Sequence, residues 1–187
     1  MTRIPYSFEE DNKLPHDFKE NNDKVIIIDK IDQRMLHLFI SKINEITLSE
    51  GTGAPVYLKI NSFYNDVEKT INSVFSILEI LKLSGLTVFT YANSPLGVLG
   101  TTILSSGTKG HRYINKDARL TVSRVHKSSN GEHWRKNEIL FTTLASNIGV
   151  TPYYFYQWFL DNLGLTINYD ADGAKTFGFV DKIIDEQ

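Results

Sequence analysis

Apolar β-branched runs alternate along this chain with longer segments whose apolar residues recur at helical spacing. The first run, residues 25–28, reads Val-Ile-Ile-Ile and is apolar at every position, which is typical of a strand covered on both faces. Asp32 then predicts a helix N-cap. The apolar residues that follow at helical spacing are Met35, Leu36, Phe39, Ile40, Ile43 and Ile46. This alternation favours an α/β fold with parallel strand pairing.

The same strand–helix unit recurs further along the chain. Further strands are expected over residues 56–60, 86–91, 112–114, 119–125 and 179–184. Helices are expected from Asp66 to a stop at Gly85, from about Pro95 to a stop at Gly107, and over residues 132–147, with another opened by Thr151 as cap and Pro152 as first residue.

Two regions differ in composition. Residues 1–23 are polar and are broken by Pro5 and Pro15, so they cannot bury enough apolar surface to hold a fold, and we expect a flexible N-terminal arm. No low-complexity linker interrupts the remainder, so residues 24–187 are expected to form one domain.

Composition excludes several classes of function. With 20 Lys and Arg against 22 Asp and Glu, the net charge of −2 gives no electrostatic footprint for nucleic acid. The absence of cysteine excludes disulfides, thiolate metal sites and a cysteine nucleophile. No apolar run approaches the roughly 20 residues that span a bilayer, and the first residues do not resemble a secretory signal. A cytoplasmic protein without a membrane partner is expected.

Cofactor and metal motifs are weak. None of the histidines forms an i, i+4 pair on a helix, so no metal site is predicted. Gly97 and Gly100 precede two threonines, but neither phosphate-binding glycine motif is present, and close helix–sheet packing explains these glycines better. No cofactor is expected. The histidines are His16, His37, His111, His126 and His133.

The segment 153–159 carries six aromatic residues in seven positions. At helical spacing, Tyr154, Trp158 and Phe155 are predicted to fill core, whereas Tyr153 and Tyr156 face outward. The outward rings are suited to a protein–protein contact, where tyrosine and tryptophan are enriched.

Three segments, in the right order, resemble motifs of the Clp serine peptidase family. Residues 56–62 read V-Y-L-K-I-N-S and resemble that family's Y-L-Y-I-N-S strand. Residues 104–113 read L-S-S-G-T-K-G-H-R-Y and resemble its L-T-A-G-A-K-G-K-R-F. Residues 174–183 read A-K-T-F-G-F-V-D-K-I and resemble its A-x-x-Y-G-L-V-D-x-I. The likeness extends over about residues 24–184.

The resemblance implies a Clp/crotonase-type fold, an α/β spiral of β-β-α units with a protruding helical handle. Between Ser123 and Gly149 the chain is shorter than the family's handle segment by about three helical turns. A shortened handle is therefore expected. Because this handle joins two rings in the family, its shortening argues against a double ring but not against a single ring.

The same resemblance argues against the family's reaction. Counted without gaps from the matched motifs, the nucleophile position holds Val98, the histidine position holds Ser123 and the aspartate position holds Thr166. A valine has no hydroxyl that could attack a carbonyl. The two glycine positions of the family's oxyanion hole hold Tyr64 and Asn65, whose side chains obstruct the approach of a substrate oxygen to the backbone.

A relocated triad is the alternative. His126 lies three residues beyond the histidine position, Asp161 or Asn162 could supply the acid, and Ser94 could supply the nucleophile. Each shift needs its own insertion or bulge, because strand side chains alternate between faces.

Three functions follow from the resemblance. The leading one is a catalytically inactive Clp-like subunit with a structural or regulatory role in a ring, either alone or mixed with active Clp peptidase subunits. The others are a diverged Clp serine peptidase with a relocated triad and a crotonase-like acyl-CoA enzyme.

By position, Tyr57, Leu83 and Tyr113 match the apolar cleft in which the family docks an AAA+ unfoldase, although Lys59 replaces an aromatic residue there. A lysine in an apolar cleft carries a desolvation cost, so docking of an unfoldase is less strongly predicted than the fold.

Overall fold

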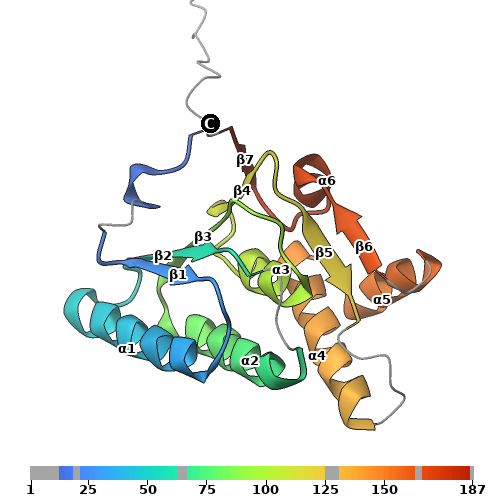
Figure 1. Ribbon diagram of the computed structural model, residues 1–187, viewed down its shortest axis with the longest axis horizontal. Coiled ribbons are helices and arrows are strands. Elements are labelled where there is room, and N and C mark those ends of the chain that lie inside the picture. Colours follow the sequence, from blue (N-terminus) through green and yellow to red (C-terminus); the bar gives the residue numbers. More distant parts are fainter. Residues whose placement is uncertain (1–12, 19–21, 63–66, 125–130, 163–165, 186–187) are drawn as a thin grey trace, which may run out of the picture.

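A central parallel sheet organises the protein (Figure 1). The computed structural model describes residues 13–18, 22–62, 67–124, 131–162 and 166–185. The sheet has five strands in the order β1-β2-β3-β4-β7, and every neighbouring pair is parallel. The strands are β1 (Val25–Ile28), β2 (Pro55–Ile60), β3 (Thr87–Ala92), β4 (Arg112–Asn115) and β7 (Lys182–Ile184).

Helices and a second, smaller sheet complete the fold. Strands β5 (Leu120–Ser123) and β6 (Thr166–Tyr169) pair antiparallel beside the central sheet. The α/β architecture predicted from the sequence is confirmed. The helices are α1 (Gln33–Glu50), α2 (Val67–Ser84), α3 (Val98–Ser105), α4 (Gly131–Ile148), α5 (Pro152–Asp161) and α6 (Ala171–Thr176), and residues His16–Phe18 form a single 3-10 turn, η1.

One face of the central sheet is sealed by helices. Along β2, Val56, Leu58 and Ile60 are fully buried and point toward the same core as α1 and α2, which lie beneath the sheet in Figure 1. Phe39 and Ile43 of α1 join that core. The alternation along β2 is what a strand with two different faces requires.

Several helix ends follow the predicted signals. The Asp32 carboxylate accepts a hydrogen bond from the Met35 N–H at 2.9 Å, and Thr151 caps α5 by accepting one from the Tyr154 N–H at 3.2 Å. Gly85 follows α2 with a positive φ of 66°, a conformation that favours glycine. The predicted cap at Asp66 lies outside the described residues.

The opposite face of the sheet is covered differently. Phe18 of η1 is only 3% exposed and packs on tyrosines of the sheet. In the described part of the expected N-terminal arm, residues 13–18 and 22–23, the structure thus has a turn packed on the sheet, and the flexibility of residues 1–23 stays a prediction. The buried Phe18 side chain supplies apolar surface that the polar composition of the segment does not indicate.

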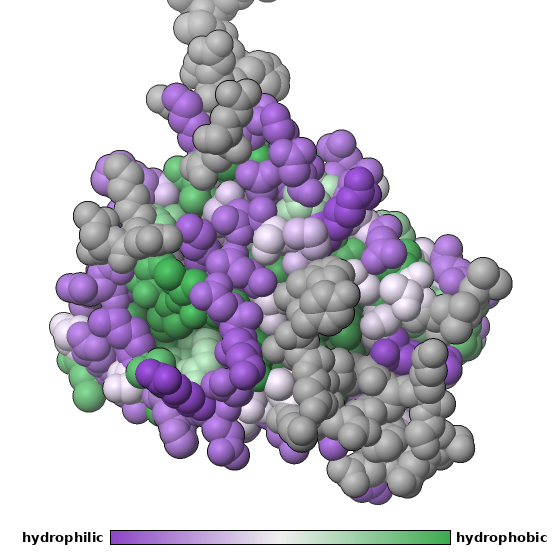
Figure 2. Space-filling model, viewed as in Figure 1, coloured by the Kyte–Doolittle hydropathy of each residue, from purple (hydrophilic) through white to green (hydrophobic). Residues whose placement is uncertain are grey.

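Strand β1 lies at the edge of the sheet and was predicted to be covered on both faces. Ile26 and Ile28 are buried in the helix-side core, but the Ile27 side chain is 40% exposed, so the prediction is wrong on the outer face. Figure 2 shows apolar side chains gathered over β1 beside α1, with polar residues around them. This edge is the most apolar part of the face in that view.

The aromatic helix α5 also differs from its prediction. Phe155 and Phe159 are buried against Phe141 of α4, with ring centroids 5.7 and 4.8 Å from it. Tyr153 and Tyr156 face outward as predicted, and Trp158 is half-buried. Tyr154 was predicted to fill core but is exposed, because the buried stripe is carried by the two phenylalanines.

Candidate functional site

The candidate site lies where β3 passes into α3. The connecting loop is fastened to β5, since the Leu96 N–H donates to the Arg119 carbonyl at 2.8 Å and the Thr121 N–H donates to the Leu96 carbonyl at 3.0 Å. Helix α3 then begins at Val98, after Gly97 as a cap without a side-chain hydrogen bond. The helix was predicted to start near Pro95, which instead lies in the loop. This arrangement fixes the first residue of α3 beside β5.

Val98 occupies the position that the family resemblance assigns to the nucleophile. Its side chain is apolar and only 6% exposed. It packs in the same core as Leu99 and Leu120. A buried isopropyl group offers neither an acidic proton nor a lone pair, so this position cannot form an acyl intermediate.

The other two triad positions are brought together by the structure. Ser123 of β5 pairs directly with Thr166 of β6 in the antiparallel register. Ser123 is half-buried and Thr166 is exposed. Thus a hydroxyl stands at each of the two positions that the resemblance assigns to the general base and its orienting acid. A neutral hydroxyl of this kind cannot take a proton from a nucleophile near neutral pH.

Strand β2 ends against α3. The Ser62 carbonyl accepts a hydrogen bond from the Gly97 N–H at 3.4 Å, and a Cβ at Gly100 would lie 2.9 Å from that same carbonyl oxygen. Gly100 therefore permits the close helix–sheet approach that the sequence predicted for the glycines here. The oxyanion-hole positions Tyr64 and Asn65 lie outside the described residues.

The relocated triad is only partly visible. Ser94 lies in the loop after β3, and its buried hydroxyl oxygen has no hydrogen-bond partner among the described residues. Asp161 is the last residue of α5 and is exposed to solvent. His126 lies outside the described residues. The described side chains of His37 and His111 lie elsewhere, the first exposed on α1 and the second packed at a tilt against Phe89 with ring centroids 4.2 Å apart.

One residue of the second resemblance motif, Arg112, forms an ion pair with one residue of the third, Asp181. Arg112 is buried at the start of β4, and its guanidinium binds both carboxylate oxygens of Asp181, at 2.9 and 2.7 Å. It also donates to the Asn147 carbonyl of α4 at 3.1 Å. The pair therefore ties the sheet to the helices, and its role is structural.

The environment of Asp181 favours its charged form. Burial by itself would raise the pKa of the Asp181 carboxyl. The hydrogen bonds and positive charge of Arg112, together with the N–H groups of Gly110 and Arg112, outweigh burial and hold that pKa below its usual value. In the sequence, these residues stand out only as matches to the resemblance motifs, because nothing local shows that residues 112 and 181 meet.

The predicted docking residues do not form one surface. Tyr57 and Tyr113 lie on the outer face of the sheet and are buried beneath Phe18, at ring-centroid distances of 5.2 and 5.9 Å. Leu83 is 76% exposed near the end of α2. This helix packs on the face of the sheet opposite to the two tyrosines. Lys59 is half-buried on β2. The structure thus separates Leu83 from the two tyrosines.

Burial raises the pKa of both tyrosine hydroxyls. It is the main reason that the pKa of Tyr57 is raised to about 12, with a further contribution from the hydrogen bond and charge of Asp17. Burial also raises the pKa of Tyr113, helped by the charge of Asp181. Sequence analysis missed Asp17 and Phe18, and the available signal was an isolated phenylalanine within a polar segment.

Other kinds of site find little support in the described part of the chain. No group of three His, Asp or Glu side chains there is arranged to hold a metal ion. Among the same residues, no helix is both long enough and apolar enough to cross a membrane.

Comparisons with known proteins reveal the fold and little more. No family model matches the sequence, and no curated protein matches it. The chain is similar to a solved structure described as an enzyme, with a TM-score of 0.75 and 18% identity over 87% of this chain and 96% of that one. It is likewise similar to a peptidase from Plasmodium falciparum, with a TM-score of 0.74 and 20% identity over the same shares. At such identities the likeness establishes a shared fold.

Proposed function

We propose that this chain is a catalytically inactive Clp-peptidase-like subunit with a structural or regulatory role in a ring-shaped assembly. The observation that carries the proposal is the start of α3 at the buried Val98, in a fold that resembles a solved peptidase structure. The pairing of Ser123 with Thr166 supports it, because neither side chain can act as the general base.

A fluorophosphonate probe tests this proposal directly, since it reacts with a serine hydroxyl that a neighbouring base activates. The wild-type chain should remain unlabelled, as should its Ser94→Ala variant. An active serine peptidase in the same experiment shows that the reagent is competent. Labelling of the wild-type chain would contradict the proposal.

A diverged peptidase with a relocated triad is the second candidate. The observation in its favour is the buried Ser94 hydroxyl, which has no hydrogen-bond partner among the described residues. If this candidate is correct, the probe labels the wild-type chain, and Ser94→Ala abolishes the labelling. His126→Ala should then also abolish it, whereas loss of the exposed Ser49 hydroxyl by Ser49→Ala should leave it unchanged.

Assembly is the second part of the proposal. The subunit would form rings with itself or with active Clp peptidase subunits. Exposed apolar side chains on α4 and α5 suit such a contact, because tyrosine and tryptophan are enriched in protein interfaces. These side chains are Trp134, Ile139, Tyr153, Tyr154, Tyr156 and Leu160.

Native mass spectrometry of the chain, alone and co-expressed with an active homologue, tests assembly. A closed ring of several subunits, or a mixed ring, is expected. A monomer under both conditions would contradict this part of the proposal and would leave the inactivity to be decided by the probe.

Docking of an AAA+ unfoldase belongs to the same proposal. Tyr57 and Tyr113 would provide its aromatic surface, whereas Leu83, on the other side of the sheet, would make a separate contact. An unfoldase that binds the Tyr57→Ala/Tyr113→Ala variant as tightly as wild type would contradict this assignment.

A further inference from the structure

Three tyrosines form an aromatic platform on the outer face of the central sheet. Tyr57, Tyr91 and Tyr113 come from the adjacent strands β2, β3 and β4, and Tyr91 pairs directly with Tyr113 in the parallel register. All three belong to one apolar cluster, separate from the core beneath the helices. The platform is therefore a second apolar surface of the sheet.

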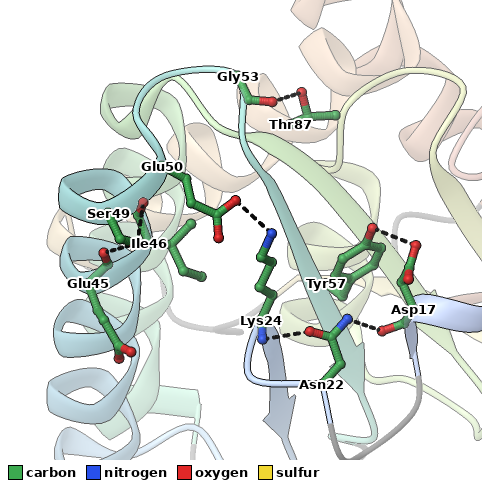
Figure 3. A network of polar contacts seen from close by, with 10 residues as sticks. All are labelled: Asp17, Asn22, Lys24, Glu45, Ile46, Ser49, Glu50, Gly53, Tyr57 and Thr87. Atoms are coloured by element: carbon green, nitrogen blue, oxygen red, sulfur yellow. Dashed lines mark hydrogen bonds and ion pairs between the residues drawn. The ribbon is translucent and has the colours of Figure 1, made fainter.

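The chain supplies its own occupant for this platform. The Phe18 ring lies edge-on to the rings of Tyr57, Tyr91 and Tyr113, at centroid distances of 5.2, 5.7 and 5.9 Å. Beside it, the Tyr57 hydroxyl donates to the Asp17 carboxylate at 3.0 Å (Figure 3). The platform thus contacts both an aromatic side chain and the carboxylate that precedes it.

The segment that carries Phe18 is a short turn outside the sheet. Residues 16–18 form one 3-10 turn, in which the Phe18 N–H donates to the Pro15 carbonyl at 3.1 Å, and they are not part of the sheet. The Asn22 side chain adds a hydrogen bond to the Asp17 carbonyl at 2.7 Å (Figure 3). A short turn with one large buried side chain can detach without disturbing a strand ladder.

One end of the aromatic surface extends beyond Phe18. The Phe89 ring packs on Tyr57 at a centroid distance of 4.8 Å, and His111 packs on Phe89 at 4.2 Å. Both Phe89 and His111 are half-buried rather than covered. An incoming peptide can therefore make contact here before the Phe18 turn leaves.

We propose that the aromatic platform is an exchangeable peptide-binding site and that residues 13–18 are its tethered competitor. A partner peptide that presents an aromatic side chain preceded by a carboxylate displaces the Asp17–Phe18 pair. The proposal rests on the docking part of the proposed function and adds to it a competing segment within the chain. It does not depend on whether the chain is catalytically inactive.

A peptide in trans tests the exchange. The probe is a fluorescently labelled peptide with the sequence of residues 13–18, Lys-Leu-Pro-His-Asp-Phe, titrated with the full-length chain and followed by anisotropy. The Phe18→Ala variant should bind it about ten-fold or more tightly than wild type, because the tethered competitor no longer occupies the site. The control variant Tyr153→Ala, which removes an exposed ring on α5, should bind like wild type.

Peptide chemistry gives the matched control. A probe with alanine in place of its phenylalanine should lose measurable binding, and one with asparagine in place of its aspartate should bind several-fold more weakly. Equal affinity of wild type and Phe18→Ala for the original probe would overturn the proposal. Equal binding of the probe that lacks phenylalanine would overturn it as well.

Wild-type protein offers a test that does not depend on the variant folding. Excess unlabelled peptide should accelerate amide exchange at Phe18, whose N–H is bonded to Pro15, and should leave exchange at Leu58 in β2 unchanged. Unchanged exchange at Phe18 with peptide in excess would contradict the proposal. If the fluorophosphonate probe labelled the chain while the exchange occurred, the proposed inactivity would fail and this inference would stand.

Discussion

The two faces of the central sheet are closed in different ways. Beneath the sheet, helices bury a continuous apolar core that includes Phe39 of α1. On the outer face, a single turn places Phe18 on three tyrosines. The helix-side core is shared by many elements, whereas on the outer face Phe18 is the one fully buried side chain of the covering turn, with Leu14 packed beside it. The fold therefore separates what holds the protein together from what a partner could replace.

The energies of the outer cover are nearly balanced. Burial of a phenylalanine side chain contributes about 1.5–3 kcal/mol, and aromatic pairs add about 0.5–1.5 kcal/mol. Ordering the backbone costs about 1–2 kcal/mol for each residue fixed. Three residues of η1 are ordered to seat Phe18, which makes three ring pairs, so the gain and the cost lie within a few kcal/mol of each other.

The same substitution on the two faces should give the sharpest contrast. Phe39→Ala should lower the free energy of unfolding by about 3–5 kcal/mol, because it leaves a cavity in a core that cannot collapse. Urea unfolding followed by circular dichroism measures the loss. A loss no larger than that of Phe18→Ala would remove the distinction between the two faces.

The Arg112–Asp181 pair fastens the sheet to the helix side, and its loss should rank second. Asp181→Asn should cost about 3 kcal/mol at pH 7, because Arg112 is left as a buried charge without its partner. Since the pKa of Asp181 is lowered in the folded state, its stabilisation is present above the unfolded value of about 3.9.

That stabilisation should be lost as pH falls through the lowered folded pKa. The gap in stability between wild type and Asp181→Asn should therefore be largest near neutrality and should close in strong acid. Urea unfolding of both proteins at a series of pH values measures it. A gap that does not depend on pH would show that the charge of Asp181 is not what stabilises the fold.

Phe18→Ala should have a smaller effect, about 1–2 kcal/mol. The shortened side chain releases the turn, so the lost burial is partly offset by backbone freedom that is regained. Urea unfolding should show this modest loss, with native circular dichroism retained. Loss of the native fold on this substitution would mean that the outer cover is part of the core.

Tyr57→Phe should have the smallest effect, about 1 kcal/mol, because it removes only the hydrogen bond to Asp17. The pKa of Tyr57 is raised to about 12 in the folded state, above the usual tyrosine value of about 10. The stabilisation is complete below pH 10 and is lost as pH rises toward 12. Ultraviolet phenolate titration should show one fewer late-ionising tyrosine in the variant.

Elements with an apolar run or helical periodicity could be predicted from the sequence, whereas long-range contacts and elements without such a pattern could not. Helical spacing and caps such as Asp32 and Thr151 located α1 and α5. Strand β6 and helix α6 were missed, because T-I-N-Y and A-D-G-A-K-T contain no run of apolar residues. One cue was available, since Asp170 caps α6 by accepting from the Gly173 N–H at 2.8 Å.

The candidate site could likewise be predicted only in part. Counting from motifs assigned Ser123 and Thr166 to the histidine and aspartate positions of the resemblance, and the strand register pairs these two residues. The cover over Tyr57 could not be predicted, because a polar segment with few apolar residues has the composition of a free arm. Likewise, periodicity predicts that α5 has a buried face, but which side chains are buried depends on where Phe141 lies, and the local sequence does not show that.

Hydrolysis of a small fluorogenic peptide tests the central claim, that the start of α3 at Val98 leaves this fold without peptidase activity. Wild type and Val98→Ser should both give background rates, because the positions assigned to the base and its orienting acid hold Ser123 and Thr166, whose hydroxyls cannot take the proton. Turnover is expected only when Ser123→His and Thr166→Asp are added together with Tyr64→Gly and Asn65→Gly. Robust cleavage by wild type, or by Val98→Ser alone, would contradict the account.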